Sequence, residues 1–215
     1  MDFEGYVSHG LNFIESRNFA LALENFEAAL ELQPDNESIG KMVEALKSQG
    51  DMLSNMPVPE STEEEDSNIA KYSEMLTRNP NDASAKGFLA SSYYNRGAVF
   101  SSMGEYEKAF EDFSKAIENS PEFYRAFNKR GWVDLELGKY DQAIEDFKTV
   151  IRYQPDNEQS KYNLAAAYQD RGIMHHKKGE YADACTDFKA GLDFDKTNST
   201  LSQLLEMAEA DMVKN

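Results

Sequence analysis

One residue pattern occurs twice in the middle of the chain, in two copies that lie 34 positions apart. Each copy contains, in this order, an Arg-Gly pair, a Gly-x-Tyr segment, a series of spaced small and aromatic residues, and a proline. The two copies are Arg96-Gly97, Gly104-Glu105-Tyr106, Ala109, Phe113, Ala116 and Pro121, and Arg130-Gly131, Gly138-Lys139-Tyr140, Ala143, Phe147, Val150 and Pro155. A fixed period of this length indicates supersecondary units that stack on one another, each packing only on its neighbours.

The period and the order of these residues resemble the tetratricopeptide-repeat family, in which one 34-residue unit is a helix, a turn and a second helix. Two further segments follow the same pattern. They are Ala22, Phe26, Ala29 and Pro34 in a first repeat, and Gly172, Gly179-Glu180-Tyr181, Ala184, Phe188 and Leu192 in a fifth. The resemblance implies an all-α superhelical solenoid of paired antiparallel helices, and a non-catalytic scaffold or adaptor that binds another protein.

The pattern divides the chain into four parts. Residues 1–50 hold the first repeat and the first helix of a degenerate second repeat. Residues 51–66 contain two prolines and a run of four acidic residues without helical periodicity, which indicates an acidic loop. Residues 67–197 hold the end of repeat two and repeats three to five, and the amphipathic segment 198–215 is expected to be a C-terminal capping helix.

Two of the repeats are longer than the others. Gly131 and Gly172, which mark repeats four and five, are 41 residues apart rather than 34. The extra seven residues make almost two helical turns and keep the faces of a helix in phase. The sequence therefore predicts lengthened first helices near residues 83–102 and 158–178.

Three glycines are expected in the middle of first helices, where glycine costs about 1 kcal/mol relative to alanine. They are Gly97, Gly131 and Gly172. Their presence indicates that the second helix of the same repeat approaches closely. We expect the opposing small surface to come from Ala109, Ala143 and Ala184.

Composition narrows the possible functions. The formal net charge of −17 disfavours nucleic acids and anionic membranes as partners, because both are polyanions. The sequence has no signal segment and no apolar stretch long enough to span a membrane, so we expect a cytoplasmic protein.

Cys185 is the only cysteine, and we interpret it as a small helix residue rather than a nucleophile. Adjacent His175 and His176 point about 100° apart on a helix and cannot form a paired metal site.

We expect neither an enzyme nor a cofactor. The sequence contains no glycine-rich phosphate loop, no serine nucleophile elbow and no Cys–His pair with an orienting partner.

The acidic run at residues 61–66 resembles an acid-directed kinase site. It also suits a helix start in which Thr62 caps the helix and Glu65 closes a capping box, and we favour this second interpretation.

The family resemblance also implies where a partner binds, because one face of each first helix lines the concave surface. By spacing, this face carries Val7, Leu11, Ile14, Lys41, Ala45, Tyr94, Asn95, Ala98, Ser101, Arg125, Asn128, Lys129, Trp132, Leu135, Gln169, Asp170, Ile173 and His176. The residues that we expect to contact a partner are Tyr94, Asn95, Arg125, Asn128, Lys129, Trp132, Leu135 and Gln169.

Repeat four differs from the others because it carries the only tryptophan, Trp132. Arg125 and Lys129 flank it within two turns, and tryptophan with basic side chains is typical of an interface hot spot. In the alternative interpretation, Trp132 packs on the lengthened first helix of repeat five.

Two other functions remain open. Co-chaperone clamps in the family hold the acidic C-terminus of heat-shock chaperones with lysine and asparagine from one first helix, asparagine from the next, and lysine plus arginine from a third. Asn95, Arg125 and Lys129 match the last two sets and Lys41 matches the first, but Ala45 replaces an asparagine. The other alternative is a self-assembling structural protein, in which repeat two and the C-terminal helix pair with a second copy.

Overall fold

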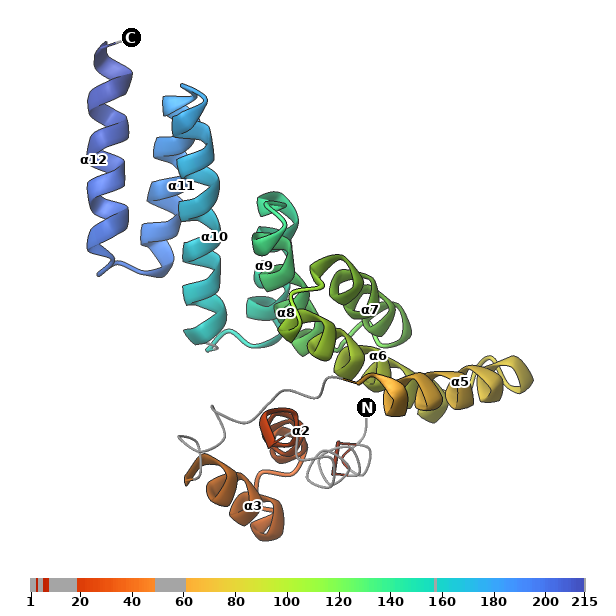
Figure 1. Cartoon of the computed structure of the whole chain (residues 1–215). Coiled ribbons are helices and arrows are strands. Elements are labelled where there is room, and N and C mark those ends of the chain that lie inside the picture. Colours follow the sequence, from red (N-terminus) through yellow and green to blue (C-terminus); the bar gives the residue numbers. More distant parts are fainter. Residues whose placement is uncertain (1–2, 4–5, 8–18, 49–60, 157, 215) are drawn as a thin grey trace. The chain divides into compact units, whose positions relative to one another are not determined.

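The computed structural model of the chain describes residues 3, 6–7, 19–48, 61–156 and 158–214. All regular structure within these ranges is helical (Figure 1). The helices are α2 (Phe19–Leu32), α3 (Glu37–Ser48), α5 (Glu63–Arg78), α6 (Ala83–Ser102), α7 (Tyr106–Asn119), α8 (Tyr124–Glu136), α9 (Tyr140–Tyr153), α10 (Glu158–Lys177), α11 (Tyr181–Phe194) and α12 (Ser199–Lys214). The all-α prediction is confirmed. Leu11, Ile14 and most of the predicted loop, residues 51–60, lie outside the described residues.

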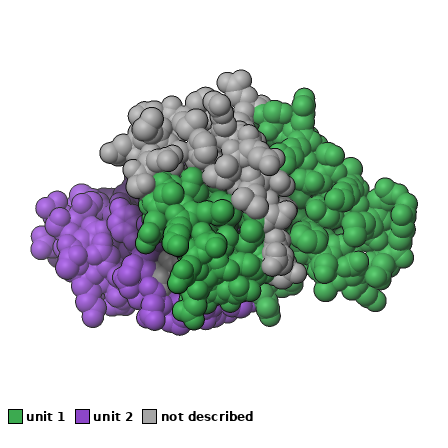
Figure 2. All heavy atoms as spheres, turned by 90° about the horizontal axis from the view of Figure 1, so that it is seen from below, with its two compact units in different colours: residues 1–123 green, residues 124–215 purple. Residues whose placement is uncertain are grey.

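The chain consists of two compact units, residues 1–123 (unit 1) and residues 124–215 (unit 2) (Figure 2). The boundary falls between the third and fourth repeats. In unit 2, α10, α11 and α12 lie side by side, and α9 packs on both α8 and α10. In unit 1, α6 packs on α5 and on α7.

Short turns join the two helices of repeats three, four and five. Each turn has three residues, and its middle residue is a glycine with positive φ. These residues are Gly104 (φ 75°), Gly138 (φ 69°) and Gly179 (φ 79°). Since side chains with a Cβ rarely adopt this conformation, the Gly-x-Tyr motif fixes the point at which each helix pair reverses direction.

The two lengthened first helices are confirmed. Helices α6 and α10 have 20 residues each, whereas α8, the first helix of repeat four, has 13. The N-terminus of α6 is fixed by Asp82, whose side chain accepts a hydrogen bond from the backbone N–H of Ala85 at 3.0 Å. An aspartate at this position satisfies one of the unpaired N–H groups of the first turn.

The second repeat differs from our prediction. Instead of pairing with α5, α3 packs on α2, and Ile39 and Val43 of α3 share a core with Phe26 of α2 and Val99 of α6. Helix α5 packs on α6. Within the described residues no comparable packing joins α3 to α5, so these two helices do not form the helix pair that the degenerate repeat suggested.

The acidic run forms the first turn of a helix, as the favoured helix-start interpretation predicts, and so does not belong to the predicted loop of residues 51–66. Helix α5 begins at Glu63, and its first turn contains all four acidic residues. Carboxylates at this end are stabilised by the positive end of the helix dipole. The expected capping box is not formed: Thr62 Oγ1 donates to Asp66 Oδ2 at 2.9 Å, Ser61 Oγ accepts from the N–H of Glu63, and Glu65 is buried.

The C-terminal helix α12 covers the last repeat, as its amphipathic pattern predicts. Leu201 and Ala208 of α12 are fully buried in a core with Phe188 of α11. Cys185 lies in the same core as a small buried residue.

The mid-helix glycines do face the second helix of their own repeat. A Cβ at Gly131 would lie 3.0 Å from the Phe147 ring, and a Cβ at Gly172 would lie 2.5 Å from the Phe188 ring. The opposing atoms nearest to these glycines are therefore aromatic rings rather than the alanines that we expected. The glycine makes room for the ring.

We expect Gly172→Ala to destabilise the chain by about 1–3 kcal/mol, because the added methyl group overpacks the contact with Phe188. Gly40→Ala is the matched control, since Gly40 lies inside α3 and a Cβ added there would have nothing within 4 Å. Helix propensity should stabilise this control by up to about 1 kcal/mol. Urea unfolding followed by circular dichroism measures both changes. Stabilisation by both substitutions would contradict the close approach of α10 and α11.

Candidate functional site

Six of the eight predicted contact residues lie in unit 2, on α8 and α10. Arg125, Asn128, Lys129 and Gln169 are half-buried, and Trp132 is 39% exposed. The three residues Arg125, Lys129 and Trp132 follow one another at helical spacings of four and three, which places them on one face of α8. The sixth residue, Leu135, packs against the core that Ile144, Phe147 and Leu164 form, so its role is at least partly structural.

The lengthened part of α10 reaches α8 at the predicted site. Asn163 Nδ2 donates a hydrogen bond to Asn128 Oδ1 at 3.2 Å. Asn128 therefore takes part in holding two first helices together. Trp132 retains a partly exposed indole on the same helix.

The two predicted contact residues in unit 1 are buried. Tyr94 packs against the rings of Phe113 and Phe123, with ring centroids 5.7 Å and 5.0 Å away. Asn95 is fully buried, and its Nδ2 donates to Glu65 Oε1 at 3.2 Å. In this structure both side chains serve internal packing, and our expectation that they contact a partner is not supported by their exposure. For Asn95 the reason is the approach of Glu65 from α5, which the spacing of α6 alone could not reveal.

Glu65 is a buried carboxyl group at the junction of α5 and α6. Burial raises its pKa from 4.5 to about 7, and the hydrogen bond from Asn95 partly opposes this effect. A buried group that titrates near neutral pH makes the stability of this junction sensitive to pH.

A bidentate Arg–Asp pair joins the two helices of each of repeats three, four and five. Each arginine immediately precedes the mid-helix glycine, and each aspartate immediately precedes the phenylalanine that faces that glycine. The pairs are Arg96–Asp112 (2.7 and 2.8 Å), Arg130–Asp146 (2.8 and 2.9 Å) and Arg171–Asp187 (2.9 and 2.6 Å). Sequence reasoning missed these pairs, although the signal was present: Arg-Gly is followed by Asp-Phe at a constant separation of 16 residues.

Two of these arginines also bind an aspartate of the preceding repeat. These inter-repeat pairs are Arg96–Asp66 (2.6 Å) and Arg171–Asp141 (2.5 Å). In both, the arginine Nη1 reaches an aspartate 30 residues earlier in the chain. Helices α5 and α6 are therefore aligned with each other in the same way as helices α9 and α10.

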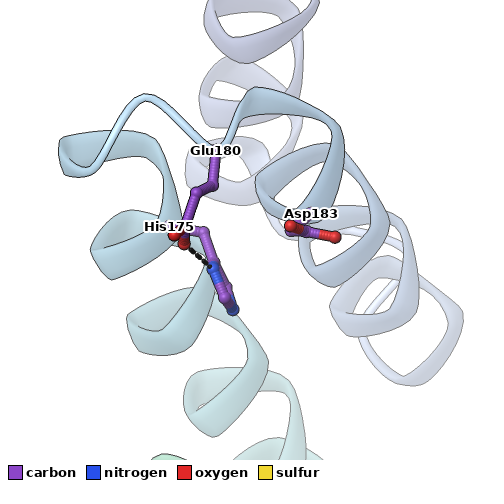
Figure 3. Close-up of side chains that lie close together, drawn as sticks. All are labelled: His175, Glu180 and Asp183. Atoms are coloured by element: carbon purple, nitrogen blue, oxygen red, sulfur yellow. Dashed lines mark hydrogen bonds and ion pairs between the residues drawn. The ribbon is translucent and has the colours of Figure 1, made fainter.

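A histidine and two carboxylates meet at the turn between α10 and α11 (Figure 3). His175 Nδ1 lies 2.6 Å from Glu180 Oε2, and one potential ligand atom from each of His175, Glu180 and Asp183 lies within 4.8 Å of the others. Zinc ligands sit about 2.0–2.2 Å from the ion, so these atoms would have to draw together to share one. His176 points instead to Asp211 of α12 at 3.2 Å, as the angle between adjacent helical residues predicts.

No helix in the described part of the chain is both long and apolar enough to span a membrane.

Three segments match family models. Residues 3–36 and 90–123 match models described as tetratricopeptide repeat, and residues 131–172 match a model described as TPR repeat. Together the matched segments cover just over half of the chain.

The chain is also similar to individual proteins that contain tetratricopeptide repeats or have a similar structure. The chain is 26% identical over 158 residues to the "Hsp70-Hsp90 organizing protein" of Triticum aestivum, covering 67% of this chain but only 26% of the relative. A crystal structure of MamA protein has 18% identity and a TM-score of 0.43, with 92% of this chain and 94% of that chain covered. The second TPR domain of human RPAP3, in complex with the HSP70 peptide SGPTIEEVD, has 22% identity and a TM-score of 0.40, covering 56% and 94%.

We expect Glu65→Gln to remove a pH dependence of stability. Because the folded-state pKa of Glu65 is raised from 4.5 to about 7, the folded chain binds this proton more tightly than the unfolded chain. Its contribution therefore becomes more favourable as the pH falls from about 7 towards 4.5, and is lost as the pH rises through 7. At pH 8 the variant should be more stable than the wild type by on the order of 1–3 kcal/mol, and at pH 4.5 about equal.

Urea unfolding of both proteins at several pH values measures this difference. Glu63→Gln is the matched control, because Glu63 is exposed in the same helical turn and is not among the groups that shift the pKa of Glu65. A pH profile that changes equally in the two variants would contradict the burial of Glu65.

Proposed function

The chain belongs to the tetratricopeptide-repeat family, and we propose that it is a protein-interaction adaptor whose helix α8 contacts a peptide segment or helix of its partner. Arg125, Lys129 and Trp132 form the centre of this contact, which we call the α8 face. We propose further that the protein is not an enzyme and acts in the cytoplasm. We also propose a second copy of the chain as a further partner.

The observation that carries this proposal is the partly exposed Trp132 beside two cationic residues. Large exposed aromatic side chains next to arginine are enriched at the energetic centres of interfaces. The chain carries a net charge of −17, so a cationic face stands out against a surface that otherwise repels anions. A ligand suited to the α8 face therefore has an acidic group next to an apolar anchor.

A more specific candidate ligand is the acidic C-terminal tail of a heat-shock chaperone. It is favoured by the relative named Hsp70-Hsp90 organizing protein and by the spacing of Arg125 and Lys129. The chain spans about a quarter of the length of that relative. Against a complete clamp stand Asn95, which is buried and bonded to Glu65, and Ala45 in place of asparagine.

We expect Trp132→Ala to weaken partner binding by about 2 kcal/mol or more, as the loss of a buried aromatic anchor does. Arg125→Ala combined with Lys129→Ala should weaken binding and also flatten its dependence on salt, since these charges act through screened attraction. Affinity capture of partners followed by titration of the captured protein at several salt concentrations measures both effects. The peptide SGPTIEEVD, free and with an amidated C-terminus, tests the chaperone-tail candidate directly.

Lys189→Ala combined with Lys196→Ala is the control for lost charge, because both lysines are exposed in unit 2 away from α8. It should bind the partner with nearly normal affinity. If Trp132→Ala unfolds the protein while the Arg125 and Lys129 variant binds normally, Trp132 is a core residue and the α8 face is not the contact. Equal binding of the free and amidated peptides would argue against a clamp for a C-terminal carboxylate.

A further inference from the structure

Unit 2 contains a pocket of about 300 Å³ at the junction of α9 and α10. Its walls come from Tyr140, at the start of α9, from the C-terminal half of α10 and from the residue after α10. The lining residues are Tyr140, Asp170, Ile173, Met174, Lys177 and Lys178. Asp170 and Ile173 are among the residues that the family resemblance assigns to the concave surface.

In unit 1 the two equivalent residues are buried and bind each other. The equivalence follows from the two inter-repeat Arg–Asp pairs. In unit 2 the pair is Asp141 and Arg171, and the residues just before them are Tyr140 and Asp170. In unit 1 the pair is Asp66 and Arg96, and the residues just before them are Glu65 and Asn95. In unit 1 these two residues meet in the buried hydrogen bond from Asn95 to Glu65. In unit 2 the corresponding residues line a cavity instead. The same alignment of two helices therefore gives a buried hydrogen bond in unit 1 and a pocket in unit 2.

The charged groups of the pocket have opposite signs at its two ends. Asp170 is half-buried, and burial, with a smaller contribution from the nearby Glu136 carboxylate, raises the pKa of Asp170. Within the described part of the chain, the Asp170 side chain has no hydrogen bond or ion pair. The exposed Lys177 and Lys178 side chains likewise form no ion pair with a described residue. Charged groups left unpaired beside a cavity are suited to a ligand that carries the opposite charges.

The spacing of these groups limits the shape of the ligand. Asp170 and Lys177 are seven residues apart in α10, so they lie on one face with a rise of about 10 Å between them. Ile173 and Met174 lie between the two charges and provide an apolar surface. In a polyproline II segment, residues three positions apart point to the same side and are separated by about 9 Å. Such a segment would match both charges.

We propose that this pocket binds an extended segment of a partner protein that carries a basic residue and an acidic residue three positions apart, with apolar residues between them. The basic side chain pairs with Asp170, the acidic side chain pairs with Lys177 or Lys178, and the apolar residues contact Ile173 and Met174. This inference rests on the proposed adaptor function, because its occupant is a peptide segment of the partner.

Titration of the full chain with short peptides, followed by NMR of the backbone amides, tests the proposal. The probes are capped peptides with the cores Arg-Leu-Leu-Glu and Glu-Leu-Leu-Arg, and the controls are Glu-Leu-Leu-Glu and Arg-Leu-Leu-Arg. We expect saturable shifts at Tyr140, Asp170 and Ile173 for at least one mixed-charge order, with at least fivefold weaker binding of both controls. Absence of saturable shifts, or equal binding of a control peptide, would overturn the proposal.

Variants of the pocket assign the charges. Asp170→Asn, which preserves side-chain shape, and Lys177→Ala combined with Lys178→Ala should each weaken the preferred peptide at least fivefold. Asp183→Asn on the exposed surface of α11 is the control and should bind normally. The exchange of charges in Asp170→Lys with Lys177→Asp should reverse the preferred order of the peptide. Thermal melting checks that each variant is folded, and if the exchanged variant is not, the other two decide. Unchanged binding by Asp170→Asn would reject the pocket.

The variants of the α8 face separate this inference from the proposed function. Trp132→Ala and the Arg125 and Lys129 variant should keep their affinity for the mixed-charge peptides. If they lose partner capture while Asp170→Asn keeps both capture and peptide binding, the α8 face is supported and the pocket inference fails. If only Asp170→Asn loses peptide binding, the pocket stands even where the α8 face does not.

Discussion

The contact on which repeats three, four and five depend is the approach of a phenylalanine ring to a glycine in the facing helix. At Gly131 a Cβ would already lie 3.0 Å from Phe147, so a larger residue at this position would force the ring to give way. This approach brings together the residues one position earlier, Arg130 and Asp146, which form a bidentate pair. Removal of one partner would leave a largely buried charge without compensation, which is costly. Steric fit and charge pairing therefore select the same alignment of the two helices.

Local pattern and length were sufficient to predict much of the fold. The distance from Gly131 to Gly172 predicts the extra turns of α10, because insertions of seven residues keep helical phase. The pairing of α3 was not predictable in the same way. Periodicity shows that Ile39 and Val43 share a face, but a face does not specify which helix will cover it, and in this chain α2 does.

The candidate site shows the same division between local and distant causes. Arg125, Lys129 and Trp132 could be placed on one helical face from their spacing alone. Asn95 had an equally suitable spacing, yet Glu65, 30 residues earlier, binds it inside the protein. The pairing depends on the packing of α5 against α6, and no property of either residue alone indicates it. Non-local contacts of this kind decide which residues of a repeat face remain available for a ligand.

The single tryptophan has a practical consequence. Because Trp132 is the only indole in the chain and belongs to unit 2, tryptophan emission is an intrinsic optical reporter of that unit alone, whereas the helices of both units contribute to circular dichroism. A comparison of the two signals during unfolding would tell apart melting of unit 2 from melting of unit 1 without any label. The partly exposed indole also lies on the proposed ligand-binding helix, so the same emission can register the arrival of a partner.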